Sequence, residues 1–263
     1  MVYVDVHTHL THALFSADID AVIERARKAG VVRMITNGTN DITNRHANAL
    51  AARYPDVVRC AYGAYPIDAL NLTQPSEGLA VNPHFDLDKE IEYWHKHKDE
   101  FIAVGEVGLD YKYGAGHERA QQENFTACIA AAEKLHKPII VHTRKAERDC
   151  VDMLISSRIP AHKIILHSFM GRKSIIKDAA DHGMTFSIPP IIRRLDQFQQ
   201  LATNVNVTQL LTETDAPYLG PDKDTRNEPA NVIETVKLIA TLKKLDPQEV
   251  ARTFFMTYRR AFE

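Results

Sequence analysis

The sequence lacks the features that mark several classes of protein. It contains only three cysteines, at positions 60, 128 and 150, and none belongs to a Cys-x-x-Cys pair. An odd, widely spaced set argues against a disulfide scaffold and indicates reduced, buried thiols in a cytosolic protein. No apolar run approaches the ~20 residues that a membrane span needs. The first residues alternate like a strand, unlike a secretory leader. We therefore expect a soluble, cytoplasmic protein without a membrane partner.

A strong charge bias and a glycine-rich phosphate-binding segment are also absent. The formal net charge is −2, so bulk electrostatics do not indicate a nucleic-acid-binding protein, although a local basic patch could still bind one. No Gly-x-Gly-x-x-Gly segment follows the first apolar stretch. This argues against the simplest form of dinucleotide binding.

Strand and helix patterns alternate along nearly the whole chain. Apolar stretches typical of strands occur at 2–6, 31–36, 57–63, 101–108, 138–143, 163–168, 184–188 and 207–215. Helical patterns lie between most of them, and 232–245 and 247–262 close the chain. About eight such units predict a (β/α)₈ TIM barrel formed by one domain over 1–263, with a doubly wound open sheet as the alternative. The irregular stretch 65–86 is expected to be a rim loop or lid.

Metal-ligand side chains follow the apolar stretches. The segment VDVHTHLTH holds His7, His9 and His12, and residues two apart share one face of a strand. His7 and His9 therefore form a candidate pair, and His12 falls outside that register. In a barrel, further residues would join the pair where the strands end: Glu106, His142, His167 and Asp215. Each could individually be a core residue, an ion-pair partner or a helix cap, but burying all six without a cation would be costly.

Six ligands exceed what one tetrahedral zinc requires and suit two ions ~3.5–4 Å apart. Glu106 is the natural bridge, because a carboxylate offers one oxygen to each ion. Strands one and eight become neighbours when a barrel closes, which groups His7, His9 and Asp215 with Glu106. His142 and His167 would then hold the second ion. Imidazole and carboxylate ligands favour Zn²⁺ or Mn²⁺, with Mg²⁺ a further possibility among divalent ions.

Other acidic residues near these positions have supporting roles in this prediction. Asp215 could also orient or deprotonate the attacking water, so that Glu106 and Asp215 are the predicted catalytic residues. Asp5, Asp110 and Glu213 are expected behind the ligands, where they would orient the imidazoles. Ion pairs at the rim are an alternative for Asp110 and Glu213. A buried aspartate bonded to backbone is an equal alternative for Asp5.

At these residues the sequence resembles the TatD family of metal-dependent deoxyribonucleases, within the amidohydrolase-like barrels. The segments DVHTHL, GEVGLDY, VHTR, LHSFMG, TETDAPYL and RNEPA resemble the family's motifs in the same order. The resemblance implies the ligand roles described above and hydrolysis of phosphodiester bonds, often with exonuclease character on DNA. Family members usually carry histidine in a Gly-x-His-Pro segment, where this chain has Tyr65 in YGAYP. This difference leaves the expected metal site intact and bears on the substrate.

Cations in the later loops could neutralise a phosphate substrate, and Arg144 and Arg226 are the candidates for contact with it. Aromatic side chains could stack on unpaired bases; the candidates are Tyr65, Tyr111, Tyr113 and Phe169. Single-stranded DNA ends fit a concave barrel mouth better than a duplex does. No protein partner is evident.

Three functions follow. The leading prediction is a two-metal hydrolase of phosphodiesters, a TatD-type deoxyribonuclease acting as a 3'-5' exonuclease on single-stranded DNA by means of a metal-bound hydroxide. The alternative keeps the metals and hydrolyses a carbonyl ester, amide or lactone, including the ester of an aminoacylated RNA. A metal-stabilised binding protein without turnover would require an incomplete ligand set, and none of the six ligands is missing.

Overall fold

The computed structural model describes residues 1–72 and 78–263, and its centre is a sheet of eight strands. The strands are β1 (Tyr3–Thr8), β2 (Val31–Asn37), β3 (Val58–Tyr62), β4 (Ala103–Gly108), β5 (Ile139–His142), β6 (Ile164–His167), β7 (Thr185–Ile188) and β8 (Leu210–Thr212). Each pairs in parallel with the next along the chain. Parallel neighbours in chain order are the arrangement that right-handed strand–helix–strand crossovers produce.

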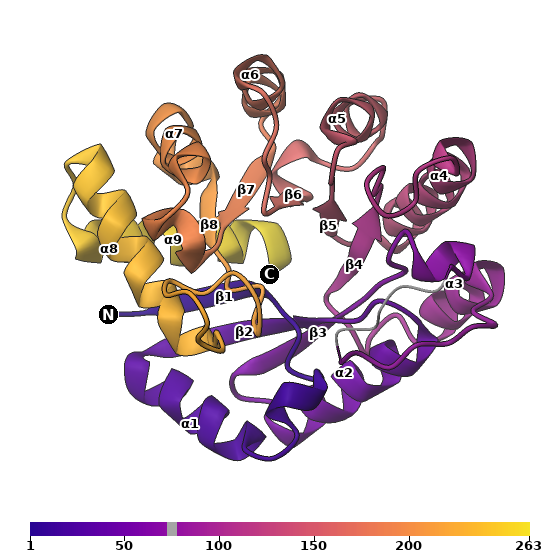
Figure 1. Cartoon of the computed structure of the whole chain (residues 1–263), viewed down its shortest axis with the longest axis horizontal. Helices are drawn as coiled ribbons and strands as arrows, with labels where there is room; N and C mark the ends of the chain where they lie inside the picture. The colour runs from indigo at the N-terminus through magenta and orange to yellow at the C-terminus, as the bar shows by residue number, and fades with distance from the viewer. Residues whose placement is uncertain (73–77) are drawn as a thin grey trace.

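The first and last strands close the sheet into a barrel. The backbone N–H of Asp215 donates to the carbonyl of His7 at 2.8 Å, and His9 N–H donates to the carbonyl of Ala216 at 2.8 Å. Deeper in the barrel, the Thr212 hydroxyl donates to the carbonyl of Val4 at 2.5 Å. Figure 1 shows the strands around the centre with the helices outside them. The predicted (β/α)₈ TIM barrel is confirmed, and the open sheet is excluded.

Nine helices alternate with the strands or follow them in the described part of the chain. They are α1 (Ile19–Ala29), α2 (Asp41–Arg53), α3 (Leu87–Lys96), α4 (Glu118–Leu135), α5 (Glu147–Ile155), α6 (Lys173–His182), α7 (Asp196–Asn204), α8 (Val232–Lys243) and α9 (Pro247–Phe262). Helix α1 ends at Gly30, whose φ of 90° is the left-handed conformation that glycine adopts without steric cost. Over residues 1–72 and 78–263, no helix is both long and apolar enough to span a membrane.

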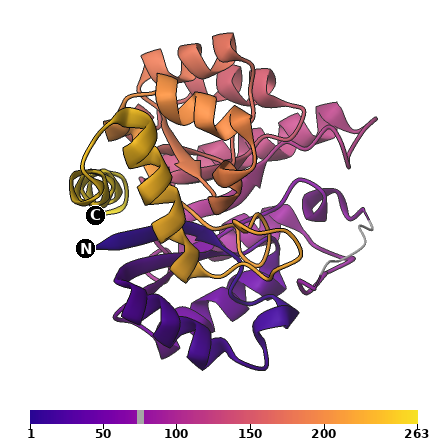
Figure 2. The ribbon, with the colours of Figure 1, turned by 60° about the vertical axis from the view of Figure 1, so that its left-hand side comes forward.

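The last helix covers the end of the barrel opposite the strand carboxyl ends. The Thr257 hydroxyl and the Arg260 guanidinium of α9 both donate to the carbonyl of Thr208, which precedes β8. In Figure 2 this helix is seen nearly end-on beside the N-terminus. With that end covered, the opposite rim remains for chemistry, as in barrel enzymes generally.

The strands are buried because both of their faces are covered, one by the barrel interior and the other by helices. Every residue of β1, β4, β6, β7 and β8 is buried. Cys60, Cys128 and Cys150 are buried and unpaired, as the sequence predicts. Burial raises the pKa of Cys60 and of Cys128 to about 12, which keeps these thiols protonated and unreactive.

Two sequence predictions differ in detail from the structure. The segment predicted as a strand over 207–215 forms β8 only at Leu210–Thr212, because Val207–Gln209 make a 3₁₀ turn and the residues after Thr212 turn into the site. The irregular stretch 65–86 contains a 3₁₀ turn, η2 (Asp68–Leu70). Its residues 73–77 lie outside the described residues, and the lid prediction for them remains a prediction.

Candidate metal centre

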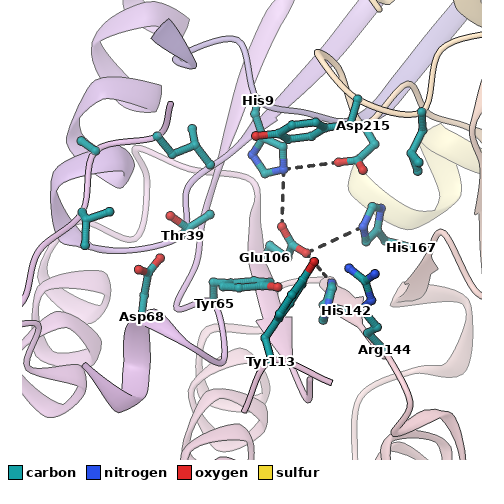
Figure 3. Close-up of a pocket in the computed structure, with 15 residues that line it drawn as sticks. His9, Thr39, Tyr65, Asp68, Glu106, Tyr113, His142, Arg144, His167 and Asp215 are labelled. Atoms are coloured by element: carbon teal, nitrogen blue, oxygen red, sulfur yellow. Dashed lines mark ion pairs between the residues drawn. The ribbon is translucent and has the colours of Figure 1, made fainter. Parts of the chain in front are cut away.

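Six ionisable side chains converge at the carboxyl ends of the strands. Figure 3 shows those of His9, Glu106, His142, His167 and Asp215. His7 lies in β1 and His9 follows it; Glu106 lies in β4; His142 and His167 end β5 and β6; Asp215 follows β8. Their ligand atoms form three overlapping groups, each within 4.8 Å: His7, His9 and Glu106; Glu106, His142 and His167; and His7, His167 and Asp215. The structure therefore brings together all six residues that the sequence selected.

Glu106 lies between two pairs of imidazoles. Its Oε2 is 3.4 Å from Nε2 of His7 and 3.5 Å from Nε2 of His9. Its Oε1 is 2.9 Å from Nδ1 of His142 and 3.7 Å from Nε2 of His167. Each oxygen of one carboxylate thus faces its own pair of ring nitrogens, which is the arrangement that a bridging ligand requires.

Asp215 completes the group around the first pair. Its Oδ1 lies 3.6 Å from Nε2 of His7 and 3.4 Å from Nε2 of His9. The backbone of Asp215 has a φ of 53°, in the left-handed region that aspartate adopts more readily than most residues. Its N–H donates to the carbonyl of His7, so the closure of the barrel also holds this carboxylate beside the histidines.

The outer nitrogen of three imidazoles faces a fixed acceptor. Nδ1 of His9 lies 3.2 Å from the carbonyl of Asn37, at the end of β2. Nε2 of His142 lies 3.0 Å from Oδ2 of Asp110, and Nδ1 of His167 lies 3.0 Å from Oε2 of Glu213. A proton held on the outer nitrogen leaves the inner nitrogen with a lone pair for a metal ion.

The three acidic residues that we expected behind the ligands have different surroundings. Asp110 and Glu213 contact ligand imidazoles directly, and both are buried. Asp5 instead accepts hydrogen bonds from the backbone N–H groups of His7 and Thr214 and from the Thr214 hydroxyl. Asp5 therefore ties β1 to the residues after β8, which is the backbone-bonded alternative that the sequence left open.

The electrostatics of the centre favour a cation at its middle. Burial alone raises the pKa of Glu106, but the imidazoles of His7 and His142 outweigh it and hold the pKa well below its ordinary value. Burial lowers the pKa of His167, yet Glu213, Asp215 and Glu106 raise it to about 10. Ionised carboxylates so placed require positive charge beside them, and divalent ions supply it to this set of nitrogen and oxygen donors. The residues thus fit the metal site predicted from the sequence.

Glycine allows the backbone to approach Glu106 closely. A Cβ built on Gly63, which follows β3, would lie 2.2 Å from the carbonyl oxygen of Gly38 and 2.3 Å from the Glu106 nitrogen. No side chain fits between these strand ends. Gly63 is part of the YGAYP segment. The same segment therefore packs closely against the backbone of Glu106 and places Tyr65 in the pocket.

The centre opens into a pocket with a volume of about 370 Å³. Tyr65 and Arg144 line it. Five of the six predicted ligands line it as well: His9, Glu106, His142, His167 and Asp215. The Tyr65 hydroxyl donates to Oδ2 of Asp110 at 3.0 Å, the oxygen that also faces His142. The Arg144 guanidinium carbon lies 4.7 Å from the ring centroid of Tyr113, another lining residue.

Other side chains selected from the sequence lie elsewhere. The Arg226 guanidinium donates to Asp18 and to the carbonyl of Leu14, and Arg226 does not line the pocket, so its contact with substrate remains a prediction. Phe169 is fully buried against Phe186 and offers no surface for stacking. Tyr111 donates to Asp149 outside the pocket.

His12 is also separate from the six ligands. It is buried, and its Nδ1 accepts a hydrogen bond from the N–H of Leu14 at 3.0 Å, which caps the 3₁₀ turn η1 (Ala13–Phe15). It belongs to none of the three ligand groups found among the described residues.

Sequence reasoning missed one wall of the pocket, which Thr39, Asp68 and the segment 79–81 form. Asp68 lies three residues beyond Tyr65 in a stretch without helix or strand periodicity. A carboxylate so soon after the third strand end was the signal that could have identified it.

Comparison with known proteins agrees with this geometry. A model of the family described as TatD related DNase matches residues 4–263. The chain belongs to the TatD family. Human deoxyribonuclease TATDN3 is 35% identical over 251 residues, which cover 94% of this chain and 89% of the human protein. The 3'-5' ssDNA/RNA exonuclease TatD of Erwinia tasmaniensis is 29% identical over 271 residues, covering 98% of each chain. The family resemblance predicted from the motifs is confirmed.

Solved structures show the same fold. The crystal structure of YJJV, a TatD homologue from Escherichia coli K12, superposes with a TM-score of 0.86 at 22% identity and covers 99% of this chain and 97% of the other. A lactonase from Listeria monocytogenes superposes with a TM-score of 0.65 at 12% identity, covering 100% and 94%. At these identities the likeness concerns the fold alone.

Proposed function

We propose that residues 1–263 form a single TatD-type domain that hydrolyses phosphodiester bonds with two divalent metal ions. Its substrate would be single-stranded DNA, from which it removes nucleotides at the 3' end in the cytosol. The observation that carries the proposal is the position of Glu106, whose two oxygens face separate pairs of imidazoles. A single carboxylate placed in this way can offer one oxygen to each of two ions, which supports a two-metal site.

In this proposal the side chains divide between two ions. His7, His9, Asp215 and Oε2 of Glu106 would hold one ion, and His142, His167 and Oε1 of Glu106 the other. Zn²⁺ and Mn²⁺ suit this imidazole-rich set, and Mg²⁺ is the third candidate. When bound, such ions lower the pKa of a water and neutralise charge on the phosphate oxygens.

The protein's own groups prepare the reaction. Burial raises the pKa of Asp215, but the hydrogen bond with His9 and the nearby imidazoles lower it below its ordinary value, so the carboxylate is ionised. Asp215 lines the pocket and can orient the attacking water and accept its proton. Asp110 and Glu213 hold His142 and His167 in place, so these imidazoles need not reorganise during the reaction.

The pocket supports a nucleic-acid substrate. Arg144 lines it close to His142 and provides a guanidinium for the phosphate that is cleaved. The aromatic rings of Tyr65 and Tyr113 lie in the same wall, where a base could stack. The names of the human and Erwinia relatives, a deoxyribonuclease and a 3'-5' exonuclease, support DNA as the substrate.

Nucleotide release tests this proposal. The purified chain, with its metal content measured, is incubated with 5'-labelled single-stranded DNA and Mg²⁺, Mn²⁺ or Zn²⁺. We expect a ladder that shortens from the 3' end. Intact DNA with every metal, in protein shown to hold its ions, would refute the nuclease function.

One observation favours a second candidate. Tyr65 occupies the place of the family's usual histidine, and its hydroxyl donates to Asp110, so this position offers a different group to the substrate. The same metal centre could act on a carbonyl ester, lactone or aminoacyl-RNA. A panel of these esters, run beside the DNA assay, separates the two: turnover of DNA faster by orders of magnitude removes the ester function.

A further inference from the structure

Asp68 is a carboxylate in the pocket that the reaction proposed above does not use. It lies in η2 and lines the same pocket as Glu106 and Arg144. In Figure 3, Asp68 and Thr39 lie on one side of the pocket, and His167 and Arg144 lie on the opposite side with Glu106 between them. The pocket therefore has a cationic, metal-binding wall and an acidic wall that faces it.

The hydrogen-bond partners of Asp68 are neutral. The Asn40 side-chain amide lies 3.4 Å from Oδ2 of Asp68, and the same amide donates to the carbonyl of Ala80 at 2.8 Å. The Thr39 hydroxyl is the other hydrogen-bond partner. No ion pair with Asp68 exists among the described residues, and the charges that act on it most strongly, those of Glu106 and Asp41, have the same sign. Burial therefore raises the pKa of Asp68 to about 6 in spite of its hydrogen bonds.

A carboxylate without a cation recognises a narrow class of ligand groups. It accepts a hydrogen bond from a hydroxyl, and it repels a phosphate because both are anionic. The phosphodiester that is cleaved to release a terminal nucleotide is attached to the 5' side of the last sugar. The 3' oxygen lies on the other side of that sugar, so a nucleotide bound with its phosphate at the metal wall would direct this oxygen toward the wall that holds Asp68.

We propose that Asp68 and Thr39 form a wall that binds the terminal 3' hydroxyl of the DNA strand and excludes a terminal 3' phosphate. This inference rests on the proposed exonuclease function and adds its end-group specificity. The volume of about 370 Å³ is of the size of a single terminal nucleotide, so the end group of that nucleotide would lie within the pocket that Asp68 lines.

The experiment compares two single-stranded oligonucleotides that differ only in a 3' hydroxyl or a 3' phosphate. Release of the first nucleotide is measured for the metal-loaded wild type and for Asp68→Asn, which keeps the shape and removes the charge. We expect the wild type to prefer the hydroxyl end by about tenfold or more, and Asp68→Asn to reduce that preference to roughly twofold. A 5' phosphate on the same strands should change neither ratio.

Asp41→Asn is the matched control, because Asp41 bonds to Asn82 and does not line the pocket. It removes a neighbouring negative charge and should keep the wild-type preference. Asp68→Glu, which retains the charge, should also keep a preference for the hydroxyl end. Metal content and thermal unfolding of each variant show that the fold is intact.

The outcomes separate the two proposals. If the wild type releases nucleotides from both ends equally, or if Asp68→Asn keeps the full preference, the acidic wall does not select the end group and the inference is overturned. If the wild type releases nothing from either strand, the exonuclease function itself fails. Binding of the two oligonucleotides to the metal-loaded protein then still tests the role of Asp68. Equal affinity for the two ends would overturn the inference.

Discussion

His142 connects Glu106 to Asp110 through its two ring nitrogens. Its Nδ1 lies 2.9 Å from Glu106 Oε1, and its Nε2 lies 3.0 Å from Asp110 Oδ2. The same Asp110 oxygen accepts the hydrogen bond of the Tyr65 hydroxyl. A residue that replaces the family's usual histidine is thus linked through one carboxylate to His142, a proposed metal ligand. The contacts from Tyr65 to Glu106 can be tested one residue at a time.

Glu106→Gln should abolish two-metal binding, because an amide has one acceptor oxygen and a donor in place of the second oxygen. We expect hydrolysis to fall by more than the roughly 100-fold that follows loss of an outer hydrogen-bond partner. Elemental analysis of the purified variant should show at most one ion per chain. Wild-type activity with a full complement of metal would refute the bridging role.

Asp110→Asn and Glu213→Gln should weaken metal binding in the half of the site that holds His142 and His167. Each change removes the anionic partner of one imidazole, and we expect metal affinity or activity to fall by about 10- to 100-fold. Titration of the metal-free protein should show one weakened and one retained binding step. Asp152→Asn, at an exposed position of α5, is the control. Equal weakening of both steps would show that these carboxylates do not act on a single ion.

Gly63→Ala should destabilise the protein and disturb the site. The new methyl group would meet backbone atoms of Gly38 and Glu106 at 2.2–2.6 Å, and neither can move without shifting a strand end. Overpacking of this kind costs about 1–3 kcal/mol in the free energy of unfolding. Gly220→Ala is a matched control, since its nearest contact would be an ordinary 3.4 Å. Urea unfolding of both variants measures the difference, and similar losses would contradict the close-approach argument.

Asp68→Asn should stabilise the metal-free protein in a pH-dependent way. The pKa of Asp68 is raised from 3.8 to about 6, so the native state binds more protons than the unfolded state between those values, and the wild type loses stability as pH rises through them. Asparagine does not titrate. The gain of the variant over the wild type should therefore be near zero below pH 4 and reach about 1–2 kcal/mol above pH 6, after allowance for partial exposure. Chemical unfolding in chelator from pH 4 to 8 measures it; a constant difference would show that Asp68 does not titrate in this range.

Arg144→Ala and Arg226→Ala distinguish the two cations that the sequence proposed for substrate binding. Arg144 lines the pocket, and losing a charged hydrogen bond to phosphate should raise the KM for DNA by roughly 10- to 100-fold. Arg226 is held by Asp18 outside the pocket, so we expect its removal to leave KM nearly unchanged. A large rise in KM for the Arg226 variant would show that Arg226 does take part in substrate binding.

The sequence by itself determined the barrel and selected the six candidate ligands. Strand-sized apolar stretches alternate with helical patterns, and parallel strands that follow one another must bring their carboxyl ends to one rim. His7, Glu106, His142 and His167 lie within strands or end them, so their convergence followed from the fold class alone. The family motifs identified the same residues, and the family model confirms the resemblance.

Only the tertiary structure decided how these residues meet. The rings of His7 and His167 stack with centroids 3.6 Å apart. The sequence placed these two histidines with different ions, and the structure brings them into direct contact. Arg226 pairs with Asp18, and Phe169 is buried against Phe186, because the packing of loops on neighbouring elements is not encoded in local periodicity. Asp68 was missed for the same physical reason. A loop without periodicity does not indicate which of its side chains point inward. Asp68 comes to lie opposite Arg144 only when the strands close into a barrel.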